Sequence, residues 1–184
     1  ASKDTLNQFD RKTGRVLKHY AHLRDDPDSL TRCNAIRSLI QDRDDPNILW
    51  LGTHGGGVDR FDIQREVFTH HRHDPANPNS LSHDIMRVIY DDGQGVLWIP
   101  TFNGLNRFQK ATQSFTRYFH DPKDPQTISS NFLLEVYKDK ASNLWIIGKG
   151  GLSQFDAASQ TFKNYTSAHG LPDAMLTSIL EDSA

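Results

Sequence analysis

The stretch ILWLGTHGGGVDRFD, residues 48–62, places three glycines between an apolar run and a charged one. It returns as VLWIPTFNGLNRFQ at 96–109 and as LWIIGKGGLSQFD at 144–156. The only three tryptophans of the chain, Trp50, Trp98 and Trp145, mark these copies and stand 48 and 47 residues apart. A period between about 20 and 50 residues indicates a repeat architecture, so this stretch decides the fold.

Two more segments and a linker recur around the tryptophan segment in the same order. An apolar segment ending in acid comes before it, as AIRSLIQD at 35–42, IMRVIYDD at 85–92, LLEVYKD at 133–139 and LTSILED at 176–182. An aromatic segment comes after it, as REVFTHH at 65–71, QSFTRYF at 113–119 and QTFKNYT at 160–166. The linkers are rich in Asp, Pro and Asn, as in DDPDSLT at 25–31, DPANPNSLS at 74–82 and DPKDPQTIS at 121–129.

Each unit therefore holds four short segments that are rich in β-branched and aromatic residues and bounded by turn residues, which predicts four strands. No segment keeps a helical period over three turns. The tryptophan strand is apolar at successive positions, as is typical of a strand covered on both faces. The sequence thus predicts an all-β fold of β-propeller blades with four antiparallel strands. A solenoid is the alternative, although its repeats are usually shorter and leave one face exposed to water.

The unit boundaries predict about three complete blades, with partial blades at both ends. We assign a partial blade to 1–31, blades to 32–82, 83–129 and 130–174, and the first strand of a further blade to 175–184. Propellers generally close with four to eight blades, and an open one leaves unpaired strand edges. We therefore expect the chain to be a piece of a larger propeller, or copies of it to associate edge to edge.

Composition excludes several kinds of partner. The 21 basic and 23 acidic residues are interspersed and give a net charge of −2, so we expect no nucleic-acid groove. No apolar run approaches the length of about 18 residues that a membrane span needs, so we expect no direct membrane insertion by this segment. Cys33 is the only cysteine, and no intrachain disulfide is possible.

The whole unit resembles the two-component regulator propeller repeat. The resemblance rests on LWIGT and GGLNRFD with small variations and on linkers of the DPxDPxSLS type, and it covers essentially all 184 residues. It implies an extracytoplasmic, periplasmic sensor of bacterial hybrid histidine kinases, often for oligosaccharides or their breakdown products, tethered through parts of the protein outside this chain. The second unit departs from the pattern at Gln109, where other units have Asp, and at Pro100, near which we expect a bulge.

The resemblance implies a non-catalytic, ligand-sensing segment of a two-component signal transduction protein, with no cofactor. Two alternatives remain open. One is a protein-interaction scaffold, as many propellers are. The other is an enzyme similar to the streptogramin lyases, for which His54 or His83 would have to act with a divalent ion. No Ser, Cys or carboxylate pair carries a catalytic signature.

The triple glycine is not a phosphate loop, because neither a helix nor a Lys-Ser/Thr pair follows it. The equivalent TFNG and GKGG stretches indicate a hairpin turn that needs positive φ. Turns between second and third strands share one rim, so His54, Phe102, Asn103 and Lys149 are predicted to contact a small polar ligand such as an oligosaccharide. A solvated rim is the alternative.

The remaining candidate ligand contacts are His83, Asn131, Arg37 and Arg87. The two arginines hold the same place in two inner strands, where the third unit has Leu134. Facing a central channel, they would bind an anionic ligand or pair with acids at the blade edges.

No metal site is predicted. In FTHHRHDP, His71 and His73 alternate along a strand and so share a face, but the matching copies read FTRYFHDP and FKNYTSAH. The DRDDPN and DDGQG stretches at 42–47 and 91–95 resemble fragments of calcium loops without the glutamate at the twelfth place, so we interpret their acids as turn residues.

Overall fold

A computed structural model of the chain describes residues 5–33, 35–172 and 175–182. Residues 1–4, 34, 173–174 and 183–184, which the sequence analysis assigns to the partial and complete blades, lie outside the described residues. The described chain is built from strands, with one short 3-10 helix, η1 (Ser167–His169). No helix in this part of the chain is long and apolar enough to cross a bilayer.

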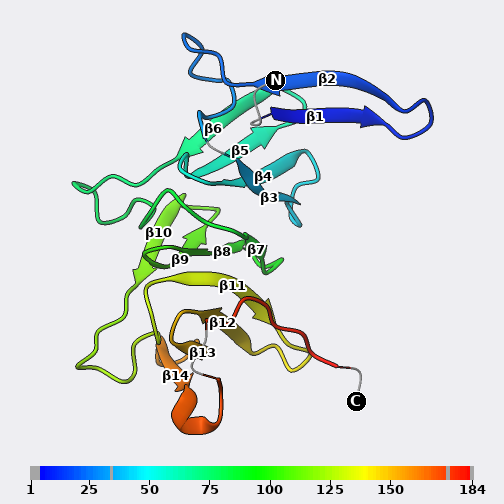
Figure 1. Ribbon diagram of the computed structural model, residues 1–184. Coiled ribbons are helices and arrows are strands. Elements are labelled where there is room, and N and C mark those ends of the chain that lie inside the picture. Colours follow the sequence, from blue (N-terminus) through cyan, green and yellow to red (C-terminus); the bar gives the residue numbers. More distant parts are fainter. Residues whose placement is uncertain (1–4, 34, 173–174, 183–184) are drawn as a thin grey trace.

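Three four-stranded antiparallel sheets follow one another along the chain, behind an N-terminal hairpin (Figure 1). The hairpin contains β1 (Thr5–Asp10) and β2 (Arg15–Ala21). The first blade contains β3 (Ile36–Gln41), β4 (Ile48–Thr53), β5 (Val58–Asp62) and β6 (Val67–His71). The second contains β7 (Tyr90–Asp91), β8 (Val96–Thr101), β9 (Gly104–Gln109) and β10 (Ser114–Tyr118). The third contains β11 (Leu133–Lys138), β12 (Leu144–Gly148), β13 (Gly151–Asp156) and β14 (Thr161–Tyr165).

The strand order within each sheet is the order of the chain, which confirms the predicted fold class: all-β, with propeller-type blades. Burial follows the same logic. All six residues of β8 are buried, as expected of a strand covered on both faces. The marker tryptophans also have a polar role, because the indole N–H of Trp50 donates to Asp42 (2.6 Å) and that of Trp145 to Asp139 (2.8 Å). In the first and third blades, the acid that follows the inner strand thus binds the indole of the next strand.

One ring contact recurs at each junction between neighbouring sheets, and we call it the aromatic clasp. The last ring of the outer strand in one sheet packs against two phenylalanines of the next sheet. Centroid distances run from 4.8 to 6.2 Å for Tyr20 on Phe61 and Phe68, His71 on Phe108 and Phe115, and Tyr118 on Phe155 and Phe162. The apolar core therefore lies between the blades and joins them in series.

The Asp/Pro linkers are fastened by buried polar residues of the third strand. Asp59 accepts the backbone N–H of Thr31 at 2.8 Å, and the equivalent Asn106 accepts that of Ser82 at 2.8 Å. In the third blade, Ser153 accepts the N–H of Ser129 at 3.1 Å. All three side chains belong to fully buried residues. A different polar residue in each blade thus satisfies the same buried linker amide, which would otherwise lack a partner.

A one-residue register shift does lie near Pro100, as expected, because the five residues from Met86 to Tyr90 oppose the four from Trp98 to Thr101. Pairing between β8 and β9 runs through Pro100 without a shift. On the other side, β7 is only two residues long, because proline offers no N–H to the inner strand. Pairing resumes at the isolated bridge from Met86 to Thr101. The same shift occurs in the first and third blades, where β3 is bulged at Arg37 and β11 at Leu134. Their partner strands contain no proline, so Pro100 is not the cause of the shift.

The triple glycine forms the predicted turn. Gly55 and Gly57 have φ of 100° and 78°, a region that favours glycine. A Cβ on Gly57 would overlap the carbonyl oxygen of His71 on the outer strand. The equivalent Gly104 and Gly151 also have positive φ and approach the carbonyls of Tyr118 and Tyr165. This glycine is required in every unit because the fourth strand crosses directly behind it.

Candidate functional site

The turns between the second and third strands place one residue of each blade at equivalent points of the rim. The backbone N–H groups of His54, Phe102 and Lys149 donate to the carbonyls of Ala35 (2.8 Å), Ile85 (3.1 Å) and Phe132 (3.0 Å), respectively. Ala35 and Phe132 directly precede β3 and β11, and Ile85 lies at the equivalent point of the second blade, ahead of β7. These bonds hold the turns against the incoming chain and fix the direction of the side chains.

Four rings meet on this rim, and we call them the rim cluster: His54, His83, Phe102 and Phe132. Phe102 stands at the centre, with its centroid 6.2 Å from that of His54, 6.5 Å from that of His83 and 4.3 Å from that of Phe132. All four side chains are partly exposed. The rings come from the first and second blades and from the residue that precedes β11, so the cluster crosses two junctions.

The two imidazoles of the rim cluster differ in their hydrogen bonds. His83 Nδ1 accepts the backbone N–H of Ile85 at 3.1 Å, which leaves the proton of the neutral ring on Nε2. His54 Nδ1 is buried and has no hydrogen-bond partner among the described residues. The cluster therefore combines aromatic faces with imidazole nitrogens, the combination that stacks on and hydrogen-bonds to a ligand with both apolar and polar surfaces.

The other predicted site residues lie outside this ring cluster. Asn103 and Lys149 are exposed in their turns. Asn131 has a structural contact, because its Oδ1 accepts the backbone N–H of His120 at 2.7 Å. Arg37 is exposed in β3, and Arg87 is exposed in the segment that precedes β7. Of the eight predicted residues, the structure thus brings His54, His83 and Phe102 into ring contact.

The histidines of FTHHRHDP lie in separate environments. His70 Nδ1 is 2.6 Å from Asp59 Oδ1, and its Nε2 is 2.9 Å from the carbonyl oxygen of Pro27. The hydrogen bond to Asp59 raises the pKa of His70, against the effect of its burial. His71 is the ring of the clasp between the first two blades, while His73 Nδ1 lies 2.8 Å from the carbonyl of Leu81.

A lysine holds three carboxylates together between the first two blades. Lys110 Nζ lies 2.9 Å from Asp42, 2.8 Å from Asp44 and 2.6 Å from Asp91. In the described part of the chain, oxygens of these three acids lie within 4.8 Å of one another, close enough to hold a metal ion. Burial lowers the pKa of Lys110, but its hydrogen bonds to the three carboxylates outweigh this and raise it. The ammonium group therefore already supplies the cation that such a cluster requires.

The DRDDPN and DDGQG acids also cap turns, as the sequence analysis expects. Asp42 Oδ1 accepts the N–H groups of Asp44 (2.8 Å) and Asp45 (3.0 Å). Asp92 Oδ1 accepts those of Gln94 (2.7 Å) and Val96 (3.1 Å). These are the short-range bonds by which aspartate stabilises turns.

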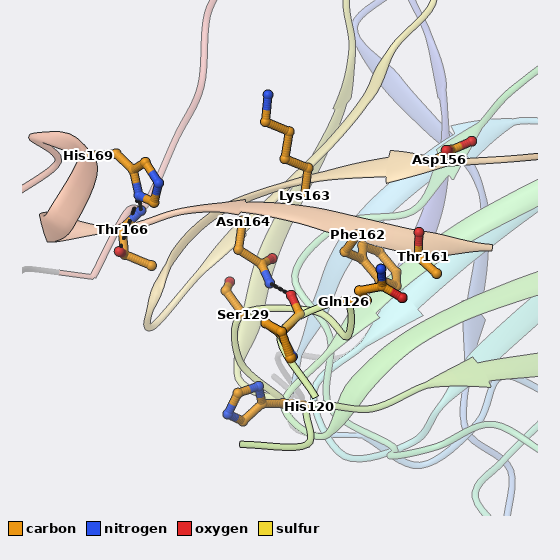
Figure 2. A pocket seen from close by; sticks show the side chains of 11 residues that line it. His120, Gln126, Ser129, Asp156, Thr161, Phe162, Lys163, Asn164, Thr166 and His169 are labelled. Carbon is orange, nitrogen blue, oxygen red and sulfur yellow. Dashed lines mark hydrogen bonds between the residues drawn. The ribbon is translucent and has the colours of Figure 1, made fainter. Parts of the chain in front are cut away.

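A cavity of about 620 Å³ lies between β14 and the linker that precedes the third blade (Figure 2). His120, Gln126, Ser129, Asn164 and His169 line it. The equivalent place in the second blade is filled by Arg117, which donates to the carbonyls of Asn77, Ser80 and Leu81. Asn164 is shorter and reaches the carbonyls of Pro125 (3.0 Å) and Thr127 (2.7 Å) instead. The cavity thus lies where a shorter linker-binding side chain leaves space.

Among solved structures, the chain is similar to extracellular domains of bacterial proteins assigned to two-component or one-component systems. The extracellular domain of BT3049 from B. thetaiotaomicron, a protein assigned to a hybrid two-component system, is similar to this chain at 27% identity and a TM-score of 0.69, over 78% of this chain and 20% of that one. The extracellular domain of BT4673 from the same organism, assigned to a one-component system, matches at 22% identity and a TM-score of 0.40, over 88% of this chain and 26% of that one.

U3-55K is similar in fold alone, at 9% identity and a TM-score of 0.52, over 70% of this chain and 38% of that one. No protein-family model and no curated protein matches the chain. The chain spans about a fifth of the length of the BT3049 extracellular domain.

Sequence reasoning missed Phe132 of the rim cluster and Lys110 of the carboxylate cluster. Phe132 directly follows the candidate Asn131 and aligns with Ala35 and Ile85. The third unit therefore has an aromatic ring where the other two have aliphatic side chains. Lys110 aligns with Ile63 and Ala157. In both cases the available signal is a residue that breaks the pattern of its own repeat.

Proposed function

We propose that this chain is an extracytoplasmic, periplasmic ligand-sensing segment of a two-component signal transduction protein of the two-component regulator propeller type, and that it acts by binding and not by catalysis. The observation that carries the proposal is the similarity to the BT3049 extracellular domain, at 27% identity and a TM-score of 0.69. The repeat pattern of the sequence supports it independently. Output domains and the membrane anchor belong to other parts of such a protein.

The rim cluster is the site that we propose for the ligand. Phe102 and Phe132 offer ring faces, while the imidazoles of His54 and His83 offer nitrogens that donate or accept hydrogen bonds. A saccharide has an apolar face of C–H groups and a polar rim of hydroxyls, which fits this combination. Asn103 and Lys149, exposed in the neighbouring turns, are placed to contact the polar parts of a small oligosaccharide.

A thermal-shift screen of the whole chain against oligosaccharides, short peptides and divalent metals tests the proposal. A ligand that binds only the folded state raises the melting temperature in a concentration-dependent way. We expect stabilisation by a saccharide, which Phe102→Ala and His83→Ala remove. The matched control is His19→Ala, which truncates an exposed imidazole on β2.

Three outcomes would contradict the proposal. Stabilisation by divalent metals alone would favour the lyase alternative, and stabilisation by peptides alone the interaction scaffold. If the Phe102→Ala variant still bound the saccharide, the ligand site would lie outside the rim cluster.

A further inference from the structure

A groove of about 350 Å³ lies between the second and third blades, and we call it the interblade groove. Trp98 and Arg107 lie on its wall in the second blade, and Lys138, Phe155 and Ala157 lie on its wall in the third. It is at the opposite end of the strands from the rim cluster, because the turns that border it join β7 to β8 and β13 to β14. A complete four-stranded blade forms each wall.

Strand alternation directs two cationic side chains into the groove. Arg107 lies on the same face of β9 as Leu105, which is buried in the core between these two blades. It also stands directly opposite Trp98 in the pairing of β8 with β9. Lys138 shares a face of β11 with Val136, which belongs to the same core. The guanidinium and ammonium groups therefore approach the groove from facing blades.

These two cations are not neutralised within the described part of the chain. Neither Arg107 nor Lys138 forms an ion pair there. The guanidinium of Arg107 donates to the amide oxygen of Gln109 at 3.3 Å, which carries no charge. Asp92 is the one acid among the described residues that line the groove, and its Oδ1 accepts two backbone N–H groups. Two cations and one carboxylate leave the groove with an excess of positive charge.

The equivalent groove between the first and second blades has the opposite arrangement. There Lys110 contacts three carboxylates, so the cation is neutralised by acids of the chain itself. In the interblade groove, Ala157 holds the position of Lys110, and Lys138 holds that of Asp91. The third unit thus loses the lysine that pairs with the acids and gains a lysine in place of an acid. Its positive charge is left for a ligand.

We infer that the interblade groove binds a small carboxylate ligand built on a single ring. The planar fork of Arg107 suits a carboxylate, to which it can donate two parallel hydrogen bonds, and Lys138 adds a charge from the opposite wall. The rings of Trp98 and Phe155, with centroids 4.9 Å apart, offer apolar surface to the body of the ligand. The volume is near the lower end for small-molecule sites, which suits one ring. The carboxylate of Asp92 disfavours a dianion.

A thermal-shift titration of the whole chain with glucuronate and with benzoate tests this site. Glucose and benzamide are the neutral counterparts, so each pair isolates the contribution of the carboxylate. A ligand of the folded state raises the melting temperature in a concentration-dependent way. We expect at least one carboxylate to do so and its neutral counterpart not to. Binding of glucuronate alone would support the site as one for a sugar acid, and binding of benzoate alone as one for an aromatic acid.

Substitutions locate the ligand. Arg107→Gln and Lys138→Met should each weaken the binding by about tenfold or more, because each removes a charged hydrogen-bond donor. Both side chains are partly exposed, and the melting temperature without ligand reports whether each variant keeps the fold. Arg60→Gln is the matched control, because Arg60 holds the equivalent place in the first groove, and it should leave the affinity unchanged.

Four results would overturn the inference. The first is that neither carboxylate raises the melting temperature, and the second is that binding survives both Arg107→Gln and Lys138→Met. The third is an equal effect of inorganic sulfate, which would mean that the groove does not select a carboxylate. The fourth is an equal loss in Arg60→Gln, which would show a general attraction of anions to the protein. Phe102→Ala should leave carboxylate binding intact, which separates this site from the rim cluster.

Discussion

At the scale of single residues, His70 and His71 are neighbours in sequence with opposite surroundings. They alternate along β6, so one faces the linker and the other the next blade. His70 lies on two acceptors, Asp59 and the Pro27 carbonyl, and its pKa is raised. Burial lowers the pKa of His71 to about 4, and the charges of Arg60 and His70 add to this effect. Its Nε2 is buried without a partner in the described residues.

His71 is expected to make the protein sensitive to acid. Its folded pKa of about 4 lies below the ordinary 6.5, so between these pH values His71 is protonated in the unfolded chain and neutral in the folded one. Stability falls by up to about 3 kcal/mol as pH drops through this window. Urea unfolding at about pH 7.5 and about pH 4.5 should show a smaller loss for His71→Tyr, which restores the ring found at Tyr20 and Tyr118. The exposed His19→Tyr should lose as much as the unmodified chain; equal losses in all three would count against the prediction.

His70 is expected to give the opposite pH dependence of stability. A raised folded pKa gives stability that is fully present below pH 6.5 and is lost as pH rises through the folded pKa. His70→Ala should therefore cost more at about pH 6 than at about pH 9, since it also leaves the buried Asp59 carboxylate without its charged partner. Urea unfolding at both values measures the difference. A pH-independent cost would mean that the ring acts only by packing.

The roles of these two residues could not be predicted from the sequence. The pattern shows a local cluster of histidines, and it predicts that adjacent strand residues face opposite ways. It does not show that Asp59, eleven residues earlier, lies on one side, or that Phe108 and Phe115 lie on the other. Only the packing of neighbouring blades brings these groups together.

At the scale of elements, the turn that opens the third strand has one strict requirement. Gly57, Gly104 and Gly151 all have positive φ, and each approaches a carbonyl of the outer strand. The repeat itself predicted this turn, because its glycine is present in all three copies. The two-residue length of β7 was not predicted, because Pro100 acts on the neighbouring strand and not on its own.

Comparing alanine substitutions at Gly57 and Gly14 should separate the cost of backbone strain at positive φ from the cost of steric overlap with the outer strand. Gly57→Ala meets both a positive φ and the His71 carbonyl, and we expect a loss of about 3 kcal/mol or more. Gly14 has a similar φ of 71° but no atom within 4 Å of an added Cβ, so Gly14→Ala should cost only about 1 to 2 kcal/mol. Thermal and urea unfolding of both variants give the comparison. Similar losses would show that the outer strand moves aside.

The Lys110 cluster joins elements of two blades, and its removal gives a testable change. Lys110→Met leaves Asp42 and Asp91 buried without their shared cation, and we expect a loss of about 3 to 5 kcal/mol. The freed carboxylates lie close enough to hold calcium, so Ca²⁺ should restore part of the loss. Lys12→Met in the exposed hairpin turn is the control. A variant that is as stable as the unmodified chain, with or without Ca²⁺, would contradict this account.

At the scale of the whole molecule, the blades are joined in series, so stability should decrease from the middle outwards. The second blade packs against a neighbour on each side, while the hairpin has two strands and one neighbour. Segment 175–182 is held to the third blade by bonds such as those of Glu181 to Tyr137 (3.3 Å) and to the N–H of Lys140 (3.0 Å).

Hydrogen exchange followed by mass spectrometry should resolve this gradient. We expect amides of β1, β2 and 175–182 to exchange first and those of β8 and β9 last, because elements with fewer buried contacts open independently. Exchange of the hairpin at the rate of β8 would indicate a single cooperative unit.

The aromatic clasp also bears on how such a chain changes in length. Every full blade both contributes an inserting ring and receives one, so the contact surface that a blade offers behind it matches the one that it needs in front. Duplicating or deleting one unit of about 47 residues therefore leaves the ring contacts of the clasp paired. Genetic recombination between copies can therefore change the number of blades in whole steps while the clasp is kept at each new junction.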